Sequence, residues 1–274
     1  MTIAEAYQHA FNLGKVDDFS IREWLRYLHG LSSMSELVMH FDKPLKDHDR
    51  FLQGLLQLEK GMPVAYLIQE TSFMGMNLYV DPRVLIPRPE TEELIALTVK
   101  LMKQWNIAPT AFLDLGTGSG AIALACKKFF PDAFVMGIDL SEQALNVAKK
   151  NAERLKLDVI WKQSDWFSKI ERSFRFPVIL GNPPYIDSQA TIDPSVWQYE
   201  PHEALIASPP TKHYQTMIVE GLSYLIRPGL MVFEIAPDLQ PALTDFVQAI
   251  SEIHQFGFEK DVNLKTRMLW ILVK

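Results

Sequence analysis

The segment Asn182-Pro183-Pro184-Tyr185 carries groups that can hold a reacting nitrogen atom, and it follows directly after the apolar run 177–180. Proline fixes φ at about −65° and has no backbone N–H, so two successive prolines hold the loop still and leave its carbonyl oxygens free. We interpret the Asn182 side-chain oxygen and the Pro183 carbonyl oxygen as acceptors for the N–H bonds of a substrate amide or aromatic amine. Such acceptors favour a pyramidal nitrogen with a localised lone pair, while Tyr185 packs on the flat substrate group. Asn182, Pro183 and Tyr185 are therefore catalytic candidates, and all four residues, Pro184 included, are substrate-binding candidates.

A glycine-rich segment upstream, residues 114–120 (Asp-Leu-Gly-Thr-Gly-Ser-Gly), has the composition of a nucleotide-binding loop. Its glycines let a ligand approach the backbone closely and let a helix begin at once. Gly116 and Gly118 complete a dinucleotide fingerprint G-x-G-x-x-A with Ala121, and complete the G-x-G-x-G form seen in methyltransferases with Gly120. The segment alone leaves both kinds of cofactor open. Its candidate cofactor-binding residues are Gly116, Thr117, Gly118, Ser119 and Gly120.

Two further positions suit a bound nucleoside. Asp139 ends the next expected strand, 19 residues after Gly120, where a carboxylate accepts hydrogen bonds from ribose hydroxyls. The alternative is an aspartate that only caps the helix beginning near Ser141. Trp166 follows the third expected strand and can cover an adenine ring, the alternative being ordinary core packing. Together with Asn182, these residues predict a nucleoside site beside the glycine segment.

The nitrogen-holding loop distinguishes between the two cofactors. Hydride transfer has no use for a pair of N–H acceptors. A sulfonium methyl group is an electrophile that needs neither a metal nor a strong general base, so placement and electrostatics carry the rate. The sequence therefore predicts methyl transfer from S-adenosylmethionine, with S-adenosylhomocysteine as product. No metal is expected, because the seven histidines are dispersed and no pair has ligand spacing with a carboxylate.

Alternating strands and helices after Thr91 must position these segments. The expected strands are 111–115, 134–139, 159–162, 178–181, 230–235, 256–262 and 268–273. Helices are expected between the first five strands, and the last two form an antiparallel hairpin through residues 263–265. Seven strands in this order predict an open, mostly parallel α/β sheet. The family resemblance described below implies that it is the Rossmann-like sheet of class-I S-adenosylmethionine-dependent methyltransferases.

The first 70 residues instead have the apolar period of helices, with polar breaks that predict a bundle of four or five short helices. Between Thr71 and Pro89 the apolar pattern predicts a β-hairpin with its turn at Asp81-Pro82. We expect three parts: a helical domain at 1–74, a hairpin connector at 75–88 and a catalytic domain at 89–274; the family resemblance described below implies that the first is a substrate-recognition domain and the last a methyltransferase domain.

Composition limits the class of partner. Lys and Arg total 27 against 33 Asp and Glu, a formal net charge of −6, which argues against a phosphate backbone as the main partner. Cys126 is the single cysteine, so no internal disulfide is expected, and we interpret it as a core residue. The N-terminus has no basic segment followed by an apolar run, and no long apolar run occurs elsewhere. We expect a cytoplasmic monomer that binds neither membranes nor nucleic acid directly.

Six segments of the chain resemble the protein-(glutamine-N5) methyltransferase family that modifies class-I peptide chain release factors. They are 63–66, 85–92, 114–120, 164–167, 181–186 and 199–201, the last followed by Ala204-Leu205, and the similarity covers nearly the whole chain. Asn-Pro-Pro-Tyr also occurs in enzymes that methylate amino groups of nucleic acid. The segment 86–92 (Ile-Pro-Arg-Pro-Glu-Thr-Glu), joined to a helical N-terminal part, is more specific.

The resemblance implies methyl transfer from S-adenosylmethionine to the side-chain amide nitrogen (N5) of the glutamine in a Gly-Gly-Gln loop, with a helical domain that helps to bind the release factor. It assigns the cofactor to residues 116–120 and Asp139, the border of the adenine to Trp166 and the glutamine amide to residues 182–185. Arg88, Glu90 and Glu92 match the family as well, and we interpret them as structural supports of the site.

Three departures from the family pattern, at Pro228-Gly229, Ala236 and Lys265, lie outside the proposed chemistry. Two alternatives stay open: an amino-methyltransferase acting on adenine or guanine of nucleic acid, and a non-catalytic protein that binds the cofactor. The acidic charge opposes the first, and the intact Asn-Pro-Pro-Tyr loop opposes the second.

Overall fold

The computed structural model describes residues 1–274, whose internal contacts divide them into two units. The helical unit comprises Met1–Glu70 and Asp193–Tyr199, and the sheet unit comprises Thr71–Ile192 and Glu200–Lys274. The first stretch of the helical unit thus ends at Glu70, whereas the expected helical domain ends at residue 74. This division also adds to the helical unit a short segment from far along the chain, which a division into consecutive ranges does not anticipate.

The helical unit contains the expected short helices. They are α1 (Ile3–Leu13), α2 (Asp18–His29), α3 (Met34–Met39), α4 (His48–Glu59), α5 (Val64–Ile68) and, from the later segment, α9 (Pro194–Tyr199). Side-chain oxygens of Thr2, Asp17, Ser33 and Asp47 accept backbone N–H groups at the starts of α1 to α4, which explains where these helices begin. The Tyr199 hydroxyl donates to the Lys60 carbonyl at 3.3 Å, so α9 contacts the chain just after α4.

The hairpin that opens the sheet unit is shorter than expected and turns earlier. Strands β1 (Thr71–Phe73) and β2 (Met76–Leu78) pair antiparallel, with Met74 and Gly75 between them at φ 47° and 66°. Two residues with positive φ are what a tight two-residue hairpin turn requires. The expected turn at Asp81-Pro82 was therefore wrong for this hairpin, although Val84 N–H does bond to the Asp81 carbonyl in a separate turn.

The main sheet has seven strands in the order β5-β4-β3-β6-β7-β9-β8, with only β9 antiparallel to its two neighbours. The strands are β3 (Ala111–Leu115), β4 (Phe134–Asp139), β5 (Ile160–Gln163), β6 (Phe176–Gly181), β7 (Leu225–Glu234), β8 (Gln255–Lys260) and β9 (Thr266–Val273). The predicted fold class, the seven strands and the terminal antiparallel pair are confirmed. Cys126 is buried, as expected.

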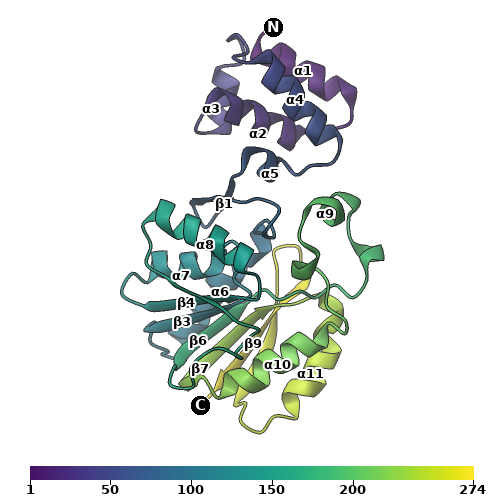
Figure 1. The fold of residues 1–274 in the computed structure, drawn as a ribbon. Coiled ribbons are helices and arrows are strands. Elements are labelled where there is room, and N and C mark those ends of the chain that lie inside the picture. Colours follow the sequence, from purple (N-terminus) through teal and green to yellow (C-terminus); the bar gives the residue numbers. More distant parts are fainter. The chain divides into compact units, whose positions relative to one another are not determined.

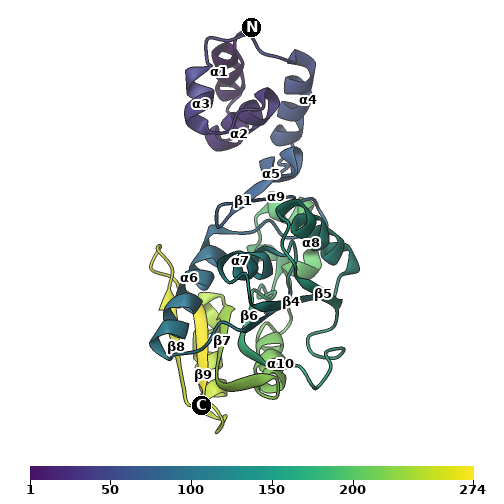
Figure 2. The same ribbon diagram turned by 90° about the vertical axis from the view of Figure 1, so that its left-hand side faces the viewer.

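Helices cover both faces of this sheet (Figures 1 and 2). One buried cluster joins the sheet to α6 (Pro89–Gln104), α7 (Ala121–Phe129) and α8 (Glu142–Leu155), and the other joins it to α10 (Thr211–Leu222) and α11 (Gln240–Gln248). Three short 3₁₀ helices complete the chain: η1 (Gln189–Thr191), η2 (His202–Ala204) and η3 (Pro237–Leu239).

The expected helix between β5 and β6 does not form. Residues 164–175 make a series of turns instead, and Phe167 and Ile170 from this segment pack into the cluster on the α10 face. The Ser164 hydroxyl accepts the Lys169 N–H at 3.0 Å and donates to the Trp166 carbonyl at 2.7 Å. A serine that satisfies nearby backbone groups in this way competes with helix formation.

The register of the sheet decides which loops meet. Leu115 on β3 pairs with Ile138 on one side and with Gly181 on the other, and Gly181 in turn pairs with Phe233. The next residues, Asp139, Gly116, Asn182 and Glu234, therefore lie at one level at the carboxyl ends of these strands. In an open α/β sheet the ligand site lies at such carboxyl ends, where neighbouring strands connect in opposite directions.

Candidate active site

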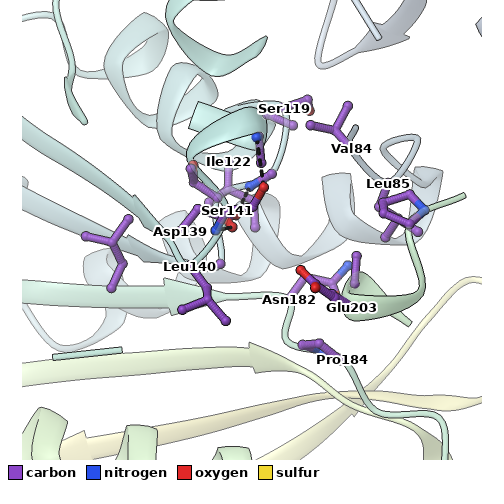
Figure 3. Close-up of a pocket in the computed structure, with 18 of the residues that line it drawn as sticks. Val84, Leu85, Ser119, Ile122, Asp139, Leu140, Ser141, Asn182, Pro184 and Glu203 are labelled. Carbon is purple, nitrogen blue, oxygen red and sulfur yellow. Dashed lines mark hydrogen bonds between the residues drawn. The ribbon is translucent and has the colours of Figure 1, made fainter. Parts of the chain in front are cut away.

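A cavity lies at the carboxyl ends of β3, β4 and β6, inside the sheet unit (Figure 3). Asp139, Leu140 and Ser141 lie on one side of it, and Asn182, Pro184 and Glu203 lie on the other. The predicted site residues that line it are Gly116, Thr117, Gly118, Ser119, Asp139, Trp166, Asn182 and Pro184. Gly120, Pro183 and Tyr185 do not line it. The structure thus brings together most of the predicted residues from four separate segments.

The three glycines of the β3–α7 loop have different tasks. All three have positive φ, at 71°, 55° and 85° for Gly116, Gly118 and Gly120. A Cβ at Gly118 would meet nothing within 4 Å, whereas a Cβ at Gly120 would lie 2.9 Å from the Trp161 ring and 3.1 Å from the Ala148 Cβ. Gly118 therefore leaves its backbone open to a ligand, and Gly120 permits α7 to pack closely on its neighbours.

Asn151 on α8 supports this loop from beneath and was not singled out from the sequence. Its side chain is fully buried and donates to the Ser119 and Tyr79 carbonyls at 2.9 Å each, while its oxygen accepts the Tyr79 N–H at 2.6 Å. Nothing in its helical sequence context distinguishes it from a solvent-facing asparagine. The loop conformation is thus fixed by a residue 32 positions further along the chain.

Asp114 holds the other end of the loop. One carboxylate oxygen accepts the Thr117 hydroxyl at 2.5 Å and the Ala123 N–H at 3.1 Å, and the other oxygen is buried without a partner. Burial raises the pKa of Asp114 to about 7, and the negative charge of Asp139 acts in the same direction. This carboxyl group is structural, because it is buried and does not line the cavity.

Asp139 faces the cavity with acceptor capacity to spare. Its two oxygens accept the Gly118 N–H at 2.8 Å and the Ser141 N–H at 2.9 Å, and a carboxylate oxygen has a further lone pair for a ligand hydroxyl. The pKa of Asp139 is raised by burial. Ser141, with its hydroxyl accepting the Ala144 N–H at 3.2 Å, is the residue that caps α8, so capping does not account for Asp139.

Apolar side chains complete this wall. Leu140 lines the cavity directly after Asp139 and is 61% exposed. Trp166 lines the cavity from the turn after β5, with its ring centroid 5.2 Å from that of His213. Burial lowers the pKa of His213. Leu140 and His213 were both missed from the sequence, although Leu140 adjoins a predicted site residue.

The Asn-Pro-Pro-Tyr loop is anchored by hydrogen bonds to distant segments. Asn182 Nδ2 donates to the Thr91 hydroxyl at 3.2 Å, Thr91 donates to Glu234 at 2.7 Å, and the Tyr185 hydroxyl donates to Glu234 at 3.3 Å. Pro183 is buried, and Tyr185 packs against the core cluster on the α10 face. Burial, together with the Glu234 charge, raises the pKa of Tyr185. Its hydroxyl is therefore un-ionised at neutral pH.

The segment 86–92 forms another wall of the cavity. Arg88 lines it and binds Glu200 at 2.5 Å, and the same carboxylate accepts the Ile86 N–H at 3.1 Å. The Glu200 side chain is 1% exposed, so it joins two segments 112 residues apart inside the protein. Glu92 accepts the Met74 N–H at 2.6 Å and so holds the turn of the hairpin, while Glu90 lies in the first turn of α6.

No group of three or more His, Cys, Asp or Glu side chains is placed to hold a metal ion. None of the helices has both the length and the apolar character that crossing a bilayer requires.

Comparisons with known proteins show which family the chain resembles over most of its length. A family model described as the methyltransferase small domain matches residues 96–201. The release factor glutamine methyltransferase of Enterococcus faecalis is 34% identical over 235 residues, which cover 85% of this chain and 83% of the relative. That of Streptococcus pneumoniae is 39% identical over 194 residues, 69% of this chain and 68% of the relative. That of Lactococcus lactis is 34% identical over 254 residues, 89% and 92% of the two chains.

Solved structures match the fold at lower identity. A methyltransferase from Pyrococcus furiosus has a TM-score of 0.52 at 18% identity, covering 82% of this chain and 96% of that chain. A T. thermophilus 16S rRNA N2 G1207 methyltransferase in complex with AdoMet and guanosine has a TM-score of 0.54 at 17% identity, covering 75% of this chain and 50% of that chain. Both likenesses concern the fold alone.

Proposed function

Since the chain belongs to the release factor glutamine methyltransferase family, we propose that its cavity brings S-adenosylmethionine on the glycine loop to a glutamine amide held by Asn182. The enzyme transfers a methyl group to the side-chain amide nitrogen (N5) of the glutamine in the Gly-Gly-Gln motif of peptide chain release factors. The observation that carries the residue-level proposal is the strand register. Leu115 pairs with both Ile138 and Gly181, so the glycine loop lies between Asp139 and Asn182.

The chain offers groups that suit the cofactor. Gly118 leaves open space above its backbone, Asp139 has free lone pairs for ribose hydroxyls, and Leu140 and Trp166 present apolar surface to the same cavity. S-adenosylmethionine supplies an electrophilic methyl group. Thr117 and Ser119, which belong to the same loop, also line the cavity. We assign residues 116–120 to holding the cofactor, with Gly120 acting through the packing of α7.

The Asn-Pro-Pro-Tyr loop suits the amide that is to be methylated. We propose that Asn182 Oδ1 and the Pro183 carbonyl accept the two amide N–H bonds, which frees the nitrogen lone pair for attack. Pro184 lines the cavity beside them, and Tyr185 packs behind the loop. When the new N–C bond forms and the C–S bond breaks, the nitrogen loses a proton to solvent. No side chain of the loop needs to act as a base, because placement and electrostatic stabilisation lower the barrier.

The substrate is a protein. The relatives favour the release factor over the amino groups of nucleic acid as the methyl acceptor, and the net charge of −6 supports the same choice. We further propose that the helical unit recognises the release factor and that the sheet unit carries out the chemistry.

Transfer of labelled methyl groups tests this proposal. The assay compares a release factor carrying Gly-Gly-Gln, the same factor with that glutamine replaced by alanine, and adenine-containing DNA and RNA. We expect label on the unaltered factor alone. Label on nucleic acid would establish the alternative substrate, and S-adenosylhomocysteine binding without label on any acceptor would favour the non-catalytic protein that binds the cofactor.

A further inference from the structure

A buried relay of hydrogen bonds lies behind Asn182. Glu234 ends β7 and is 2% exposed, Thr91 in the first turn of α6 is 4% exposed, and Asn182 follows β6. The Thr91 hydroxyl donates to Glu234 Oε2 at 2.7 Å, and Asn182 Nδ2 donates to the Thr91 hydroxyl at 3.2 Å. The relay therefore runs from a buried carboxylate through one hydroxyl to the amide that faces the cavity.

The chemistry of these groups allows only one direction for the relay. An ionised carboxylate accepts hydrogen bonds and donates none, and a hydroxyl group has a single proton. Because Thr91 uses that proton to donate a hydrogen bond to Glu234, the Thr91 oxygen can only accept a hydrogen bond from Asn182. The NH₂ group of Asn182 must then point to Thr91, and its Oδ1 is left for the cavity. This conclusion does not depend on which amide atom is built as nitrogen.

Each carboxylate oxygen of Glu234 accepts a hydrogen bond from a side-chain hydroxyl group. Besides the bond from Thr91 to Oε2, its other oxygen, Oε1, accepts a hydrogen bond from the Tyr185 hydroxyl at 3.3 Å. Burial raises the pKa of Glu234, whereas the Thr91 hydroxyl and the positive charge of Arg267 favour the ionised form. The carboxylate does not line the cavity, so it acts on the substrate only through its neighbours.

We infer that Thr91 and Glu234 are positioning residues that fix the Asn182 amide with its oxygen toward the substrate, and that this orientation selects glutamine against glutamate. The inference rests on the proposed function of Asn182. A glutamine amide supplies N–H donors to two acceptor oxygens. A glutamate carboxylate has none, and it would place a negative oxygen against Asn182 Oδ1 and the Pro183 carbonyl, where a buried acceptor without a donor is costly. An inverted Asn182 amide would lose this discrimination.

Three variants separate positioning from simple packing. Thr91→Val removes the hydroxyl with little change in shape, and Thr91→Ser keeps it. Thr98→Val is the matched control, because Thr98 lies on the same helix, is 2% exposed, donates to the Leu94 carbonyl at 2.7 Å and does not line the cavity. Loss of the hydrogen bond between Thr91 and Asn182, if it is of ordinary strength, corresponds to about a tenfold change in the equilibrium between the two orientations of the Asn182 amide.

We expect Thr91→Val to lower kcat for the release factor about tenfold, with S-adenosylhomocysteine affinity within about twofold of wild type. Thr91→Ser and Thr98→Val should retain kcat within about threefold. Inhibition by a release factor with glutamate in the Gly-Gly-Gln position gives a second readout. The preference for the glutamine factor over this competitor should narrow in Thr91→Val and stay unchanged in Thr98→Val.

The reference variant Asn182→Ala separates the two levels of the proposal. If Asn182→Ala turns over as fast as wild type, the assignment of the amide clamp itself fails. If Asn182→Ala is slow while Thr91→Val matches Thr98→Val in kcat and in preference for glutamine, the clamp stands and the positioning role is refuted. Thermal unfolding of each variant shows whether a loss of kcat merely follows a loss of folded protein.

Discussion

The carboxyl group of Asp114 makes the stability of the sheet unit depend on pH in a way that one substitution should remove. Burial raises its pKa to about 7 from the ordinary value of 3.8. A carboxyl group whose pKa is raised in the folded state contributes stability that is fully present below the unfolded pKa. That stability is lost as the pH rises through the folded pKa, because folding then requires a buried charge.

The magnitude follows from the two pKa values. The folded chain binds this proton about 3 pH units more readily than the unfolded chain, which at about 1.4 kcal/mol per unit corresponds to about 4 kcal/mol over the full range. Of this contribution to the free energy of unfolding, about 3 kcal/mol is lost between pH 5 and pH 8. Asn in place of Asp114 can still accept the Thr117 hydroxyl and the Ala123 N–H, and its NH₂ group replaces the oxygen that has no partner.

Urea unfolding of wild type and Asp114→Asn at pH 5 and pH 8 measures this difference. An NH₂ group without a partner lowers the free energy of unfolding of the variant by about 1–3 kcal/mol at every pH. At pH 5 we therefore expect the two proteins to be similar in stability or wild type to be the more stable. At pH 8 the variant should gain about 3 kcal/mol relative to wild type. Groups that titrate in both proteins cancel in the comparison. An equal pH dependence in the two proteins would refute the raised pKa, as would a carbon-13 titration of the Asp114 carboxyl near pH 4.

Three other variants test the site and the division of the chain. Asn182→Ala should lower kcat on the order of 10²-fold while S-adenosylhomocysteine affinity, by calorimetry, stays within a few-fold, since one preorganised polar group leaves the reacting centre; an unchanged kcat would contradict this. Asp139→Ala should weaken S-adenosylhomocysteine binding by ~1.5–3 kcal/mol, because it removes hydrogen bonds to a charged group, and equal affinity would mean that the carboxylate does not bind the ribose. Gly54→Ala should destabilise the helical unit by about 1–3 kcal/mol, because its Cβ would lie 2.3 Å from the Trp24 ring, and this exceeds the gain in helix propensity. A raised unfolding midpoint would contradict that clash, and S-adenosylhomocysteine affinity, set by the sheet unit, should not change.

The strands of the sheet could be predicted closely because each central strand is one buried apolar run bounded by polar or glycine residues. The expected strands at 111–115 and 134–139 have the bounds of β3 and β4. All residues of β3 are buried, which is the pattern of a parallel strand covered on both faces. The errors lie where side chains compete with regular structure. Ser164 binds nearby backbone groups and replaces an expected helix with turns, and positive φ at Met74 and Gly75 moves the hairpin turn.

The positions of the site residues were predictable, whereas their hydrogen-bond partners were not. Asn182 follows an apolar strand directly and Asp139 ends one, and this local pattern is visible in the sequence. Thr91 lies 91 residues before Asn182, and Glu200 lies 112 residues after Arg88. Such pairs depend on strand order and register, which no local pattern specifies.

One row of paired residues across the sheet explains why the unpredicted partners matter. Ile138, Leu115, Gly181 and Phe233 pair in succession across β4, β3, β6 and β7. We assign a role to the residue after each member of this row: a carboxylate for the ribose, the first glycine of the cofactor loop, the amide for the substrate and the carboxylate that orients that amide. A shift of β7 by one residue would turn Glu234 to the other face of the sheet and leave Thr91 without its acceptor. The antiparallel pairing of β7 with β9 over residues 229–234 opposes that shift, so the proposed orientation of Asn182 also depends on the terminal hairpin.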